Sequence, residues 1–422
     1  MKLDYLPSSP AQKSTSLPLQ GVLVLSGVFL IIFRHLPLLV EPRIWAEEGR
    51  VFLSDALHRP YLAAFFSPHL GYYSLFNNLV ALFSVYFAPL RFAAHLFTYA
   101  AALVQITTSL VIFRSRGMLV PPGMWGFLVA LSPYLFSPAE VWLTTTNCQF
   151  WLAAGTFFIV FAKRIDTWSG LYLLLSFFTG IPSLMFFPFL LLRLFFGFCT
   201  GSSNGKSFAL AIGFLSLATQ CLVLISYFSG GNQNGRLLFQ NIPNVLGGLK
   251  EILIPFSIRY GLGAFYMFAL LVAVVFLYQA FRFSREKWDL LMAFIAMIFY
   301  STIAVAGSIG MSGGTRYGLP VYCGGFAILV TALRRACQTS PTPWKLVGVT
   351  CFSVIVVAKG IDFMGFAQQG YPRVYYSSSW PTWYDQITAR SNCGPLNVAI
   401  FPQWPDSKWS ISIPMGRGKP CS

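Results

Sequence analysis

The chain has 422 residues, of which 56% are hydrophobic, 17% aromatic and only 10% charged, and its formal net charge at pH 7 is +16. Its mean hydropathy of +0.64 excludes a soluble globular domain, because such a fold has no place to bury so much apolar surface. A strongly basic balance is one signature of nucleic-acid binding, but here the basic residues are scattered between apolar runs rather than clustered. The composition therefore predicts an integral membrane protein and argues against a nucleic-acid partner.

The amino-terminal tail, residues 1–18, is mostly polar and is expected to lie in the cytoplasm. The apolar run Leu19–Val40 follows it and is long enough to cross a hydrocarbon core of about 30 Å. This run is longer than the core of a signal peptide and has no obvious small-residue cleavage site, so we interpret it as an uncleaved anchor. The residues after it are then expected on the extracytoplasmic side.

The first outer loop, residues 41–89, begins with the string PRIWAEEGR at Pro42–Arg50, in which Glu47 and Glu48 are adjacent and Trp45 is close by. Ionisable side chains beside a membrane span are costly to desolvate and often mark a functional site. A carboxylate in a partly dry site can take a proton from an attacking hydroxyl, so both glutamates are candidate bases and Trp45 is a candidate substrate contact. The alternative is that the glutamates only begin a surface helix, where acidic side chains complement the helix dipole.

The later apolar runs are assigned by their length and by basic residues at their ends, which concentrate on the cytoplasmic side. Arg50–Pro68 suits a helix lying on the interface, and Gly71–Ala88 is treated as re-entrant or surface-lying, because a span there would place the later basic clusters on the wrong side. The other expected membrane segments are Leu90–Phe113, Leu119–Ser137, Cys148–Ala162, Trp168–Thr179, Pro182–Phe198, Phe208–Phe228, Tyr260–Phe281, Trp288–Ser308, Tyr317–Leu333 and Leu346–Phe363. The sequence thus predicts an all-α polytopic membrane domain over residues 19–364 with roughly eleven spans and the carboxyl terminus outside.

The carboxyl-terminal segment, residues 365–422, is expected to form a small extracytoplasmic cap. It combines tryptophans and prolines with short alternating runs such as Asn397–Pro402, a pattern typical of short strands. Cys393 and Cys421 would lie in an oxidising compartment there, and the sequence leaves open whether they form a disulfide.

Arginines at the outer ends of spans are candidate phosphate ligands, because a guanidinium offers bidentate donors. Arg316 lies in the string SGGTRYGLP at Ser312–Pro320, where glycines allow close approach of the backbone. Arg236 and Arg259 lie in the second large outer loop, residues 229–259. For all three arginines the alternative is an interfacial side chain that extends to lipid headgroups.

The string WLTTTNCQFW at Trp142–Trp151 places Asn147 and Gln149 among aromatic rings. Amides with flanking rings suit sugar hydroxyls and apolar sugar faces, although an aromatic belt with amides that cap a helix gives the same pattern. His58 and His69 lack partners at metal-ligand spacing and are interpreted as interfacial polar residues, with His69 kept as a candidate substrate contact. No metal and no cofactor are predicted, since no Cys/His ligand spacing occurs in the chain.

The strings WAEEG, TNCQFW and GTRYGLP, together with the long first outer loop and short middle spans, resemble the GT-C superfamily of polytopic glycosyltransferases, including bacterial members that modify surface polysaccharides. The resemblance implies inverting transfer of a sugar from a polyprenyl phosphate to a glycan or lipid-linked acceptor, on the extracytoplasmic face of the cytoplasmic membrane. It also implies that Glu47 or Glu48 is the base, Arg316 a donor-phosphate contact and Tyr317 a substrate contact. Many members carry an aspartate where this chain has two glutamates, so the choice between them stays open. Some relatives use a divalent cation, but the outer loops here hold few further carboxylates and no metal is expected.

Three other functions remain alternatives. A lipid-linked saccharide flippase or transporter would be expected to carry charges near mid-membrane and often an internal repeat, whereas the acids here cluster in outer loops and no clear repeat is visible. A polysaccharide polymerase or ligase would differ from the transferase only in the size of its donor and acceptor, and a membrane scaffold would lack catalysis. The absence of a GxxxxGK[ST] string and of a soluble Rossmann unit favours a lipid-linked donor over a nucleotide sugar.

Overall fold

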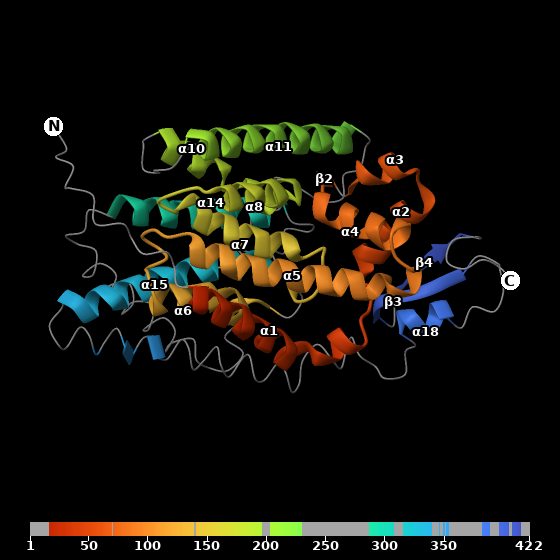
Figure 1. Cartoon of the computed structure of the whole chain (residues 1–422). Coiled ribbons are helices and arrows are strands. Elements are labelled where there is room, and N and C mark those ends of the chain that lie inside the picture. The colour runs from red at the N-terminus through yellow and green to blue at the C-terminus, as the bar shows by residue number, and fades with distance from the viewer. Residues whose placement is uncertain are drawn as a thin grey trace.

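The computed structural model describes residues 17–69, 71–138, 141–195, 203–229, 287–307, 315–339, 382–388, 396–404 and 407–414, with short helical pieces between 346 and 353. Within these ranges the long helices lie side by side as a bundle, and a β-hairpin lies at one end of it (Figure 1). The predicted segment Tyr260–Phe281 and most of Leu346–Phe363 fall outside the described residues.

Five helices of the described chain are long and apolar enough to cross a membrane: Pro18–Val40, Leu90–Arg114, Lys206–Ser229, Trp288–Ala306 and Arg316–Arg335. Large apolar side chains point outward from them, such as Leu25, Leu103 and Leu222, which are 64–70% exposed. Contiguous apolar surface of this kind is unfavourable in water and natural against lipid tails. The protein is therefore a helical membrane protein, as its composition predicts.

The helices and strands of the amino-terminal part are α1 (Leu17–Val40), η1 (Glu48–Leu53), α2 (Ser54–His58), α3 (Tyr61–Phe65), β1 (Pro68–His69), β2 (Tyr72–Tyr73), α4 (Leu75–Tyr86), η2 (Leu90–Phe92) and α5 (Ala93–Arg114). Those that follow are α6 (Met124–Phe136), α7 (Cys148–Val160), α8 (Thr167–Phe178), α9 (Ile181–Leu184), α10 (Phe187–Phe195), α11 (Ser203–Ser229), α14 (Lys287–Gly307), η7 (Thr315–Gly318), α15 (Leu319–Thr339), α18 (Trp383–Thr388), β3 (Leu396–Trp404) and β4 (Ser407–Ile413).

The centre of the bundle is α7, which packs against α5, α8 and α15. Its side chains are apolar on all sides and nearly all of them are buried, as expected for a helix enclosed by others. Trp151 from α7 lies edge-on to Trp142, with ring centroids 5.6 Å apart, and also contacts Tyr134 of α6. These rings fix the segment that joins α6 to α7, which carries part of the candidate site.

Several predicted membrane segments contain helices shorter than the roughly 20 residues that a straight crossing requires. The segments Leu119–Ser137, Cys148–Ala162 and Trp168–Thr179 contain α6, α7 and α8, of 13, 13 and 12 residues. The segment Pro182–Phe198 is divided into α9 and α10, and Gly71–Ala88 contains the 12-residue α4. The total of roughly eleven spans therefore stays a prediction.

The segment Arg50–Pro68, expected to lie on the interface, contains three short helical elements, η1, α2 and α3. The break between α2 and α3 occurs at Pro60. Arg59, directly before it, has an extended backbone with φ −106° and ψ 157°. A residue that precedes proline is disfavoured in the helical conformation, so the helix ends there.

The carboxyl-terminal strands β3 and β4 form an antiparallel hairpin, with Leu396 opposite Ile413 and a register shift between Ala399 and Gln403. The inward-facing side chains Val398, Ile400, Ile411 and Ile413 are buried in one apolar cluster with η1 and α2. The helix α18 is joined to η2 through Trp383, whose indole N–H donates to the Leu90 carbonyl at 2.9 Å. The hairpin thus packs directly behind the glutamate pair.

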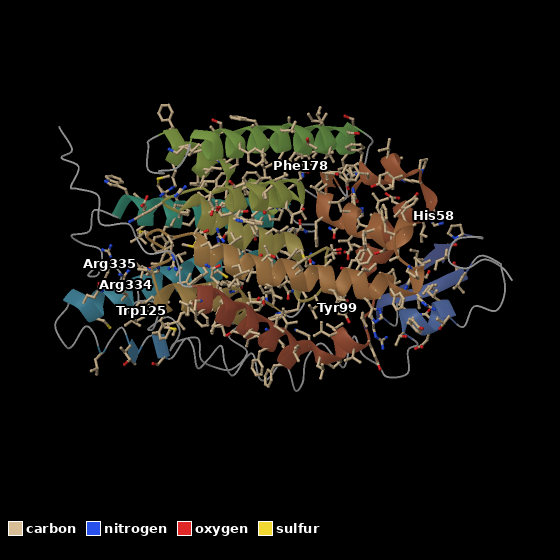
Figure 2. The ribbon with its side chains drawn as sticks, in the orientation of Figure 1. His58, Tyr99, Trp125, Phe178, Arg334 and Arg335 are labelled. Carbon is tan, nitrogen blue, oxygen red and sulfur yellow. The ribbon has the colours of Figure 1, made fainter. Side chains whose placement is uncertain are left out.

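Figure 2 shows that Arg334 and Arg335 lie together at one end of the bundle and that His58 lies at the other. His58 is exposed, and its Nδ1 donates a hydrogen bond to the Ser54 carbonyl oxygen at 2.8 Å. The glutamate pair and the hairpin lie at the same end as His58, because η1 packs against α2 and β4.

Candidate functional site

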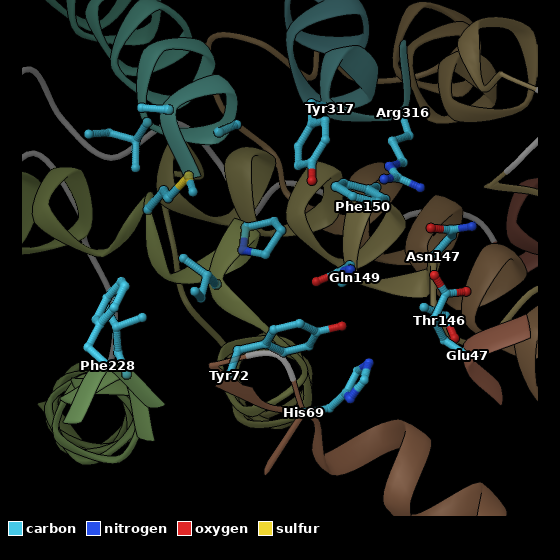
Figure 3. Close-up of a pocket in the computed structure, with 17 residues that line it drawn as sticks. Glu47, His69, Tyr72, Thr146, Asn147, Gln149, Phe150, Phe228, Arg316 and Tyr317 are labelled. Carbon is cyan, nitrogen blue, oxygen red and sulfur yellow. The ribbon is translucent and has the colours of Figure 1, made fainter. Parts of the chain in front are cut away.

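A pocket of about 260 Å³ lies where η1, the β1–β2 hairpin, α7 and η7 come together (Figure 3). One part of its wall is polar or aromatic and consists of Glu47, His69, Tyr72, Thr146, Asn147, Gln149, Phe150, Arg316 and Tyr317. The other part is apolar and consists of Ile181, Pro182, Met185, Leu224, Phe228, Ile303, Ala304 and Ala306. The pocket is therefore amphipathic, and its wall is assembled from distant parts of the chain.

Glu47 is the member of the acidic pair that lines the pocket. Its side chain is half-buried, and the Oε2 atom is buried without a hydrogen-bond partner among the described residues. A buried acceptor left without a partner costs free energy, so such an atom in a pocket marks a place where a ligand could donate a hydrogen bond. Thr146 Oγ1, also on the pocket wall, is in the same condition.

Glu48 does not line the pocket and is only 1% exposed. Its Oε1 accepts hydrogen bonds from the backbone N–H of Thr145 and, at 2.9 Å, from the Thr145 hydroxyl, while its Oε2 accepts from the backbone N–H of Trp45 at 2.9 Å. Burial raises the pKa of Glu48 to about 7, although these hydrogen bonds favour the ionised form and oppose the shift. The two glutamates therefore have different surroundings.

Arg316 and Tyr317 enter the pocket from η7, immediately before α15. The guanidinium carbon of Arg316 lies 5.5 Å from the centroid of the Tyr317 ring, and that ring stands edge-on to Phe150 at 5.0 Å. Figure 3 shows Arg316 and Tyr317 on the side of the pocket opposite to His69 and Tyr72, with Gln149 between them. A fixed cation and a carboxylate thus line one cavity.

Gln149 is held in place by close packing on Gly180, which connects α8 to α9. Gly180 has φ +116° and ψ 173°, a conformation that residues with a side chain rarely adopt. A Cβ atom added to Gly180 would collide with Oε1 of Gln149. Gly180 therefore allows the backbone turn between α8 and α9 and also leaves room for the side-chain amide of Gln149.

The β1–β2 hairpin, which carries His69 and Tyr72, is fixed by amide side chains from two helices. Gln220 of α11 accepts from the Tyr73 N–H at 2.9 Å and donates to the Tyr73 carbonyl at 3.0 Å. Asn78 of α4 donates to the carbonyls of Phe65 and Ser67 at 2.8 and 2.9 Å. Neither amide was predicted from the sequence, although a polar residue inside an apolar run is a signal for such a role. Tyr72 and Phe150 of the pocket wall were not predicted either.

The predicted site residues divide into three groups. Those that line the pocket are Glu47, His69, Asn147, Gln149, Arg316 and Tyr317. Glu48 is buried beside it, and Trp45 is not among the lining residues but donates its backbone N–H to Glu48. Arg236, Arg259, Cys393 and Cys421 fall outside the described residues. Within the described chain, no cluster of three or more His, Cys, Asp or Glu side chains forms a metal-binding group.

Comparisons with known proteins give no match: no protein-family model, no curated protein and no solved structure matches the chain. The inference of function therefore depends on the chemistry of the pocket.

Proposed function

We propose that the protein is an inverting glycosyltransferase of the membrane that transfers a sugar from a polyprenyl phosphate to a hydroxyl of a glycan or lipid-linked acceptor. The observation that carries the proposal is the amphipathic pocket, which combines the carboxylate of Glu47, the guanidinium of Arg316 and an apolar wall. The resemblance of the motif strings to the GT-C superfamily supports the same reaction.

The apolar wall supports a lipid-linked donor. Leu224 and Phe228 come from α11 and Ile303 from α14, and both helices are long enough to cross a membrane. Ile303 lines the pocket and is 40% exposed, so this part of the wall offers open apolar surface to a ligand. A substrate with a polar head and an isoprenoid tail satisfies both parts of the wall, since each part then contacts groups of its own polarity.

The reaction needs one base and a stabilised leaving group. An acceptor hydroxyl oxygen attacks the anomeric carbon of the sugar, and the bond from that carbon to the phosphate oxygen breaks with its electron pair staying on the phosphate. Glu47 takes the proton of the hydroxyl, and Arg316 stabilises the polyprenyl phosphate that leaves. Phosphate is an adequate leaving group without a proton donor, so the two residues form a minimal set.

The amides and rings of the pocket suit a sugar. Asn147 and Gln149 offer both donors and acceptors to hydroxyl groups, and Tyr317 and Tyr72 offer ring faces or hydroxyls. We place the pocket on the extracytoplasmic side, because Arg334 and Arg335 lie at the opposite end of the bundle and basic residues concentrate on the cytoplasmic side. The cytoplasmic membrane is the expected location.

The test is sugar transfer by the purified chain in lipid vesicles, supplied with a panel of polyprenyl-phosphate sugars and glycan acceptors. Glu47→Gln keeps the shape of the side chain and removes the base, so transfer should fall by about 10²–10⁴-fold. Glu41→Gln is the matched control, because Glu41 is exposed and lies outside the pocket wall, and it should transfer at the wild-type rate.

Two results would replace the proposal. If the wild type and Glu47→Gln transfer no sugar but move labelled lipid-linked saccharide between leaflets, the protein is a flippase. If whole saccharide chains are joined in preference to single sugars, it is a polymerase or ligase. Equal transfer by Glu47→Gln and the wild type would exclude Glu47 as the base.

A further inference from the structure

The second carboxylate of the acidic pair is buried outside the pocket, yet all of its hydrogen bonds lead to residues next to the pocket wall. Burying a carboxylate is costly unless hydrogen-bond donors compensate it. Glu48 accepts from three donors, which are the backbone N–H groups of Trp45 and Thr145 and the hydroxyl of Thr145. Three donors directed at one buried carboxyl group indicate that the fold specifies the relative position of the segments that carry Trp45 and Thr145.

The two segments that Glu48 joins are far apart in the sequence. Glu48 begins η1, and Thr145 lies 97 residues away in the turn that leads into α7. Each segment contributes the neighbouring residue to the pocket wall, Glu47 beside Glu48 and Thr146 beside Thr145, and Figure 3 shows these two side chains next to each other. Glu47 Oε2 and Thr146 Oγ1 are both buried and have no hydrogen-bond partner among the described residues.

We propose that Glu48 is a positioning residue that couples the η1 turn to the Thr145–Asn147 turn and thereby fixes the position of Glu47 relative to Thr146 and Asn147 in the pocket wall. The inference deepens the proposed function and rests on it, because the position of Glu47 matters for transfer only if Glu47 is the base.

A catalytic role for Glu48 itself is disfavoured by the same contacts. A general base must reach the proton that it abstracts, directly or through one water molecule. Glu48 is 1% exposed, and each of its oxygens already accepts a hydrogen bond from the protein. Adjacent residues on a helical turn point about 100° apart, so one glutamate of the pair can face the pocket while the other faces the interior.

The backbone of the turn before α7 is held in an uncommon conformation. Leu143, two residues before Thr145, has φ +51°, which is unfavourable for a residue with a side chain. The segment therefore needs contacts that maintain its shape, and the Glu48 carboxylate provides two of them at Thr145.

The experiment compares three variants of the full chain in lipid vesicles, with rates expressed per folded protein. Glu48→Gln replaces one carboxyl oxygen by an NH₂ group, which cannot accept from the N–H or hydroxyl group that it then faces. A displacement of about 1 Å in an active site can cost about 10²-fold in rate, so kcat should fall by about that factor while the donor KM stays within about twofold. Thr145→Val, which removes one donor, should lower kcat less, and Thr145→Ser, which keeps the hydroxyl, should restore the wild-type value.

Matched substitutions distinguish positioning from a general loss of stability. Asp166→Asn alters another carboxylate that accepts from a backbone N–H and a hydroxyl, both of Ser169 at 2.8 Å, but it lies outside the pocket wall. Thr156→Val alters a buried threonine of α7 that bonds Ser176 at 2.9 Å. Both controls should lower the melting temperature without changing kcat. The double variant of Glu48→Gln with Thr145→Val should be no slower than Glu48→Gln alone, because both changes break one coupling.

Hydrogen exchange measured by mass spectrometry tests the coupling without any substrate. Glu48→Gln should accelerate exchange of the Trp45 amide and of the amides at 145–147 together, since both segments lose their shared acceptor. The inference is overturned if only one segment responds, if the controls lower kcat equally, or if the double variant loses the product of the single effects. A wild type that is inert with every donor refutes the proposed function instead, and the exchange result then still decides whether Glu48 couples the two segments.

Discussion

The substitution Gly180→Ala offers a sharp test of the pocket, because its effect has two parts that can be separated. The first part is backbone strain at φ +116°, which costs about 1–3 kcal/mol for a residue with a side chain. The second part is the collision of the new Cβ with Oε1 of Gln149, which should turn the amide away from its place in the wall. A neutral hydrogen bond contributes about 0.5–1.5 kcal/mol, so losing the one from Gln149 should lower kcat/KM by about 2–12-fold.

The structure provides a matched control for the strain. Gly123 has φ +73° and ψ −145°, a conformation similar to that of Gly180, but a Cβ added there would meet no atom within 4 Å. Gly123→Ala should therefore reduce thermal stability by a similar amount without changing transfer by folded protein. Gln149→Ala in the Gly180→Ala background should cause little further loss, since the amide is already displaced.

The assay is steady-state sugar transfer at several donor and acceptor concentrations, together with thermal unfolding of the same preparations. If Gly123→Ala and Gly180→Ala lower kcat/KM equally, strain explains the effect and the role of Gln149 is excluded. Wild-type kcat/KM in Gly180→Ala, with normal folding, would refute the reasoning from the collision.

Two further predictions concern charge. The pKa of Glu48 is raised to about 7 from 4.5, so the stability that this group contributes is fully present below about pH 4.5 and is lost as the pH rises through 7. The melting temperature of the wild type should fall between about pH 4.5 and pH 7, and that of Glu48→Gln should fall less. Equal falls in the melting temperatures of the two proteins would contradict this. Asp289→Asn removes the carboxylate that pairs with Arg193, which is 1% exposed, so stability should fall by about 3 kcal/mol. The double variant Arg193→Met with Asp289→Leu should recover most of the lost stability, because no buried charge is then left unpaired. A double variant as unstable as Asp289→Asn would contradict this explanation.

The carboxyl-terminal hairpin of β3 and β4 supports the turn that carries Glu47, because it packs against η1. A Cβ added to Gly49 would lie 2.6 Å from Cδ1 of Ile400, so β3 approaches the backbone of η1 closely. Ile400 is 1% exposed and belongs to the apolar cluster that η1, α2 and the hairpin share. The turn that carries Glu47 is thus packed from behind by the hairpin and bonded from the side through Glu48.

Some conclusions followed from the sequence because they depend on composition or on local chain length. The membrane class follows from the apolar content, and the long spans α1, α5, α11, α14 and α15 overlap runs assigned to the membrane from hydropathy. The break between α2 and α3 also has a local cause that the sequence contains, which is Pro60.

Several residues of the pocket could be predicted as site residues from the sequence, but their proximity in space could not. Glu47, Gln149 and Arg316 are distant in the chain, and only the packing of η1, α7 and η7 brings them to one cavity. Trp45 was nominated by the same reasoning and does not line the pocket, because proximity in sequence does not determine which way a side chain points. Tyr72 and Phe150 carry no charge and stand among many aromatic residues, so nothing in the sequence distinguished them.

The sequence by itself determined that this is a helical membrane protein with an acidic pair after its first long helix, because both properties are local. Which of the two glutamates lines the pocket was decided only by the tertiary structure. Glu48 meets its hydrogen-bond donor Thr145 across 97 residues, and this contact leaves Glu47 to face the pocket. Side chains one residue apart differ in direction by about 100°, and their surroundings come from distant segments whose placement no local pattern encodes.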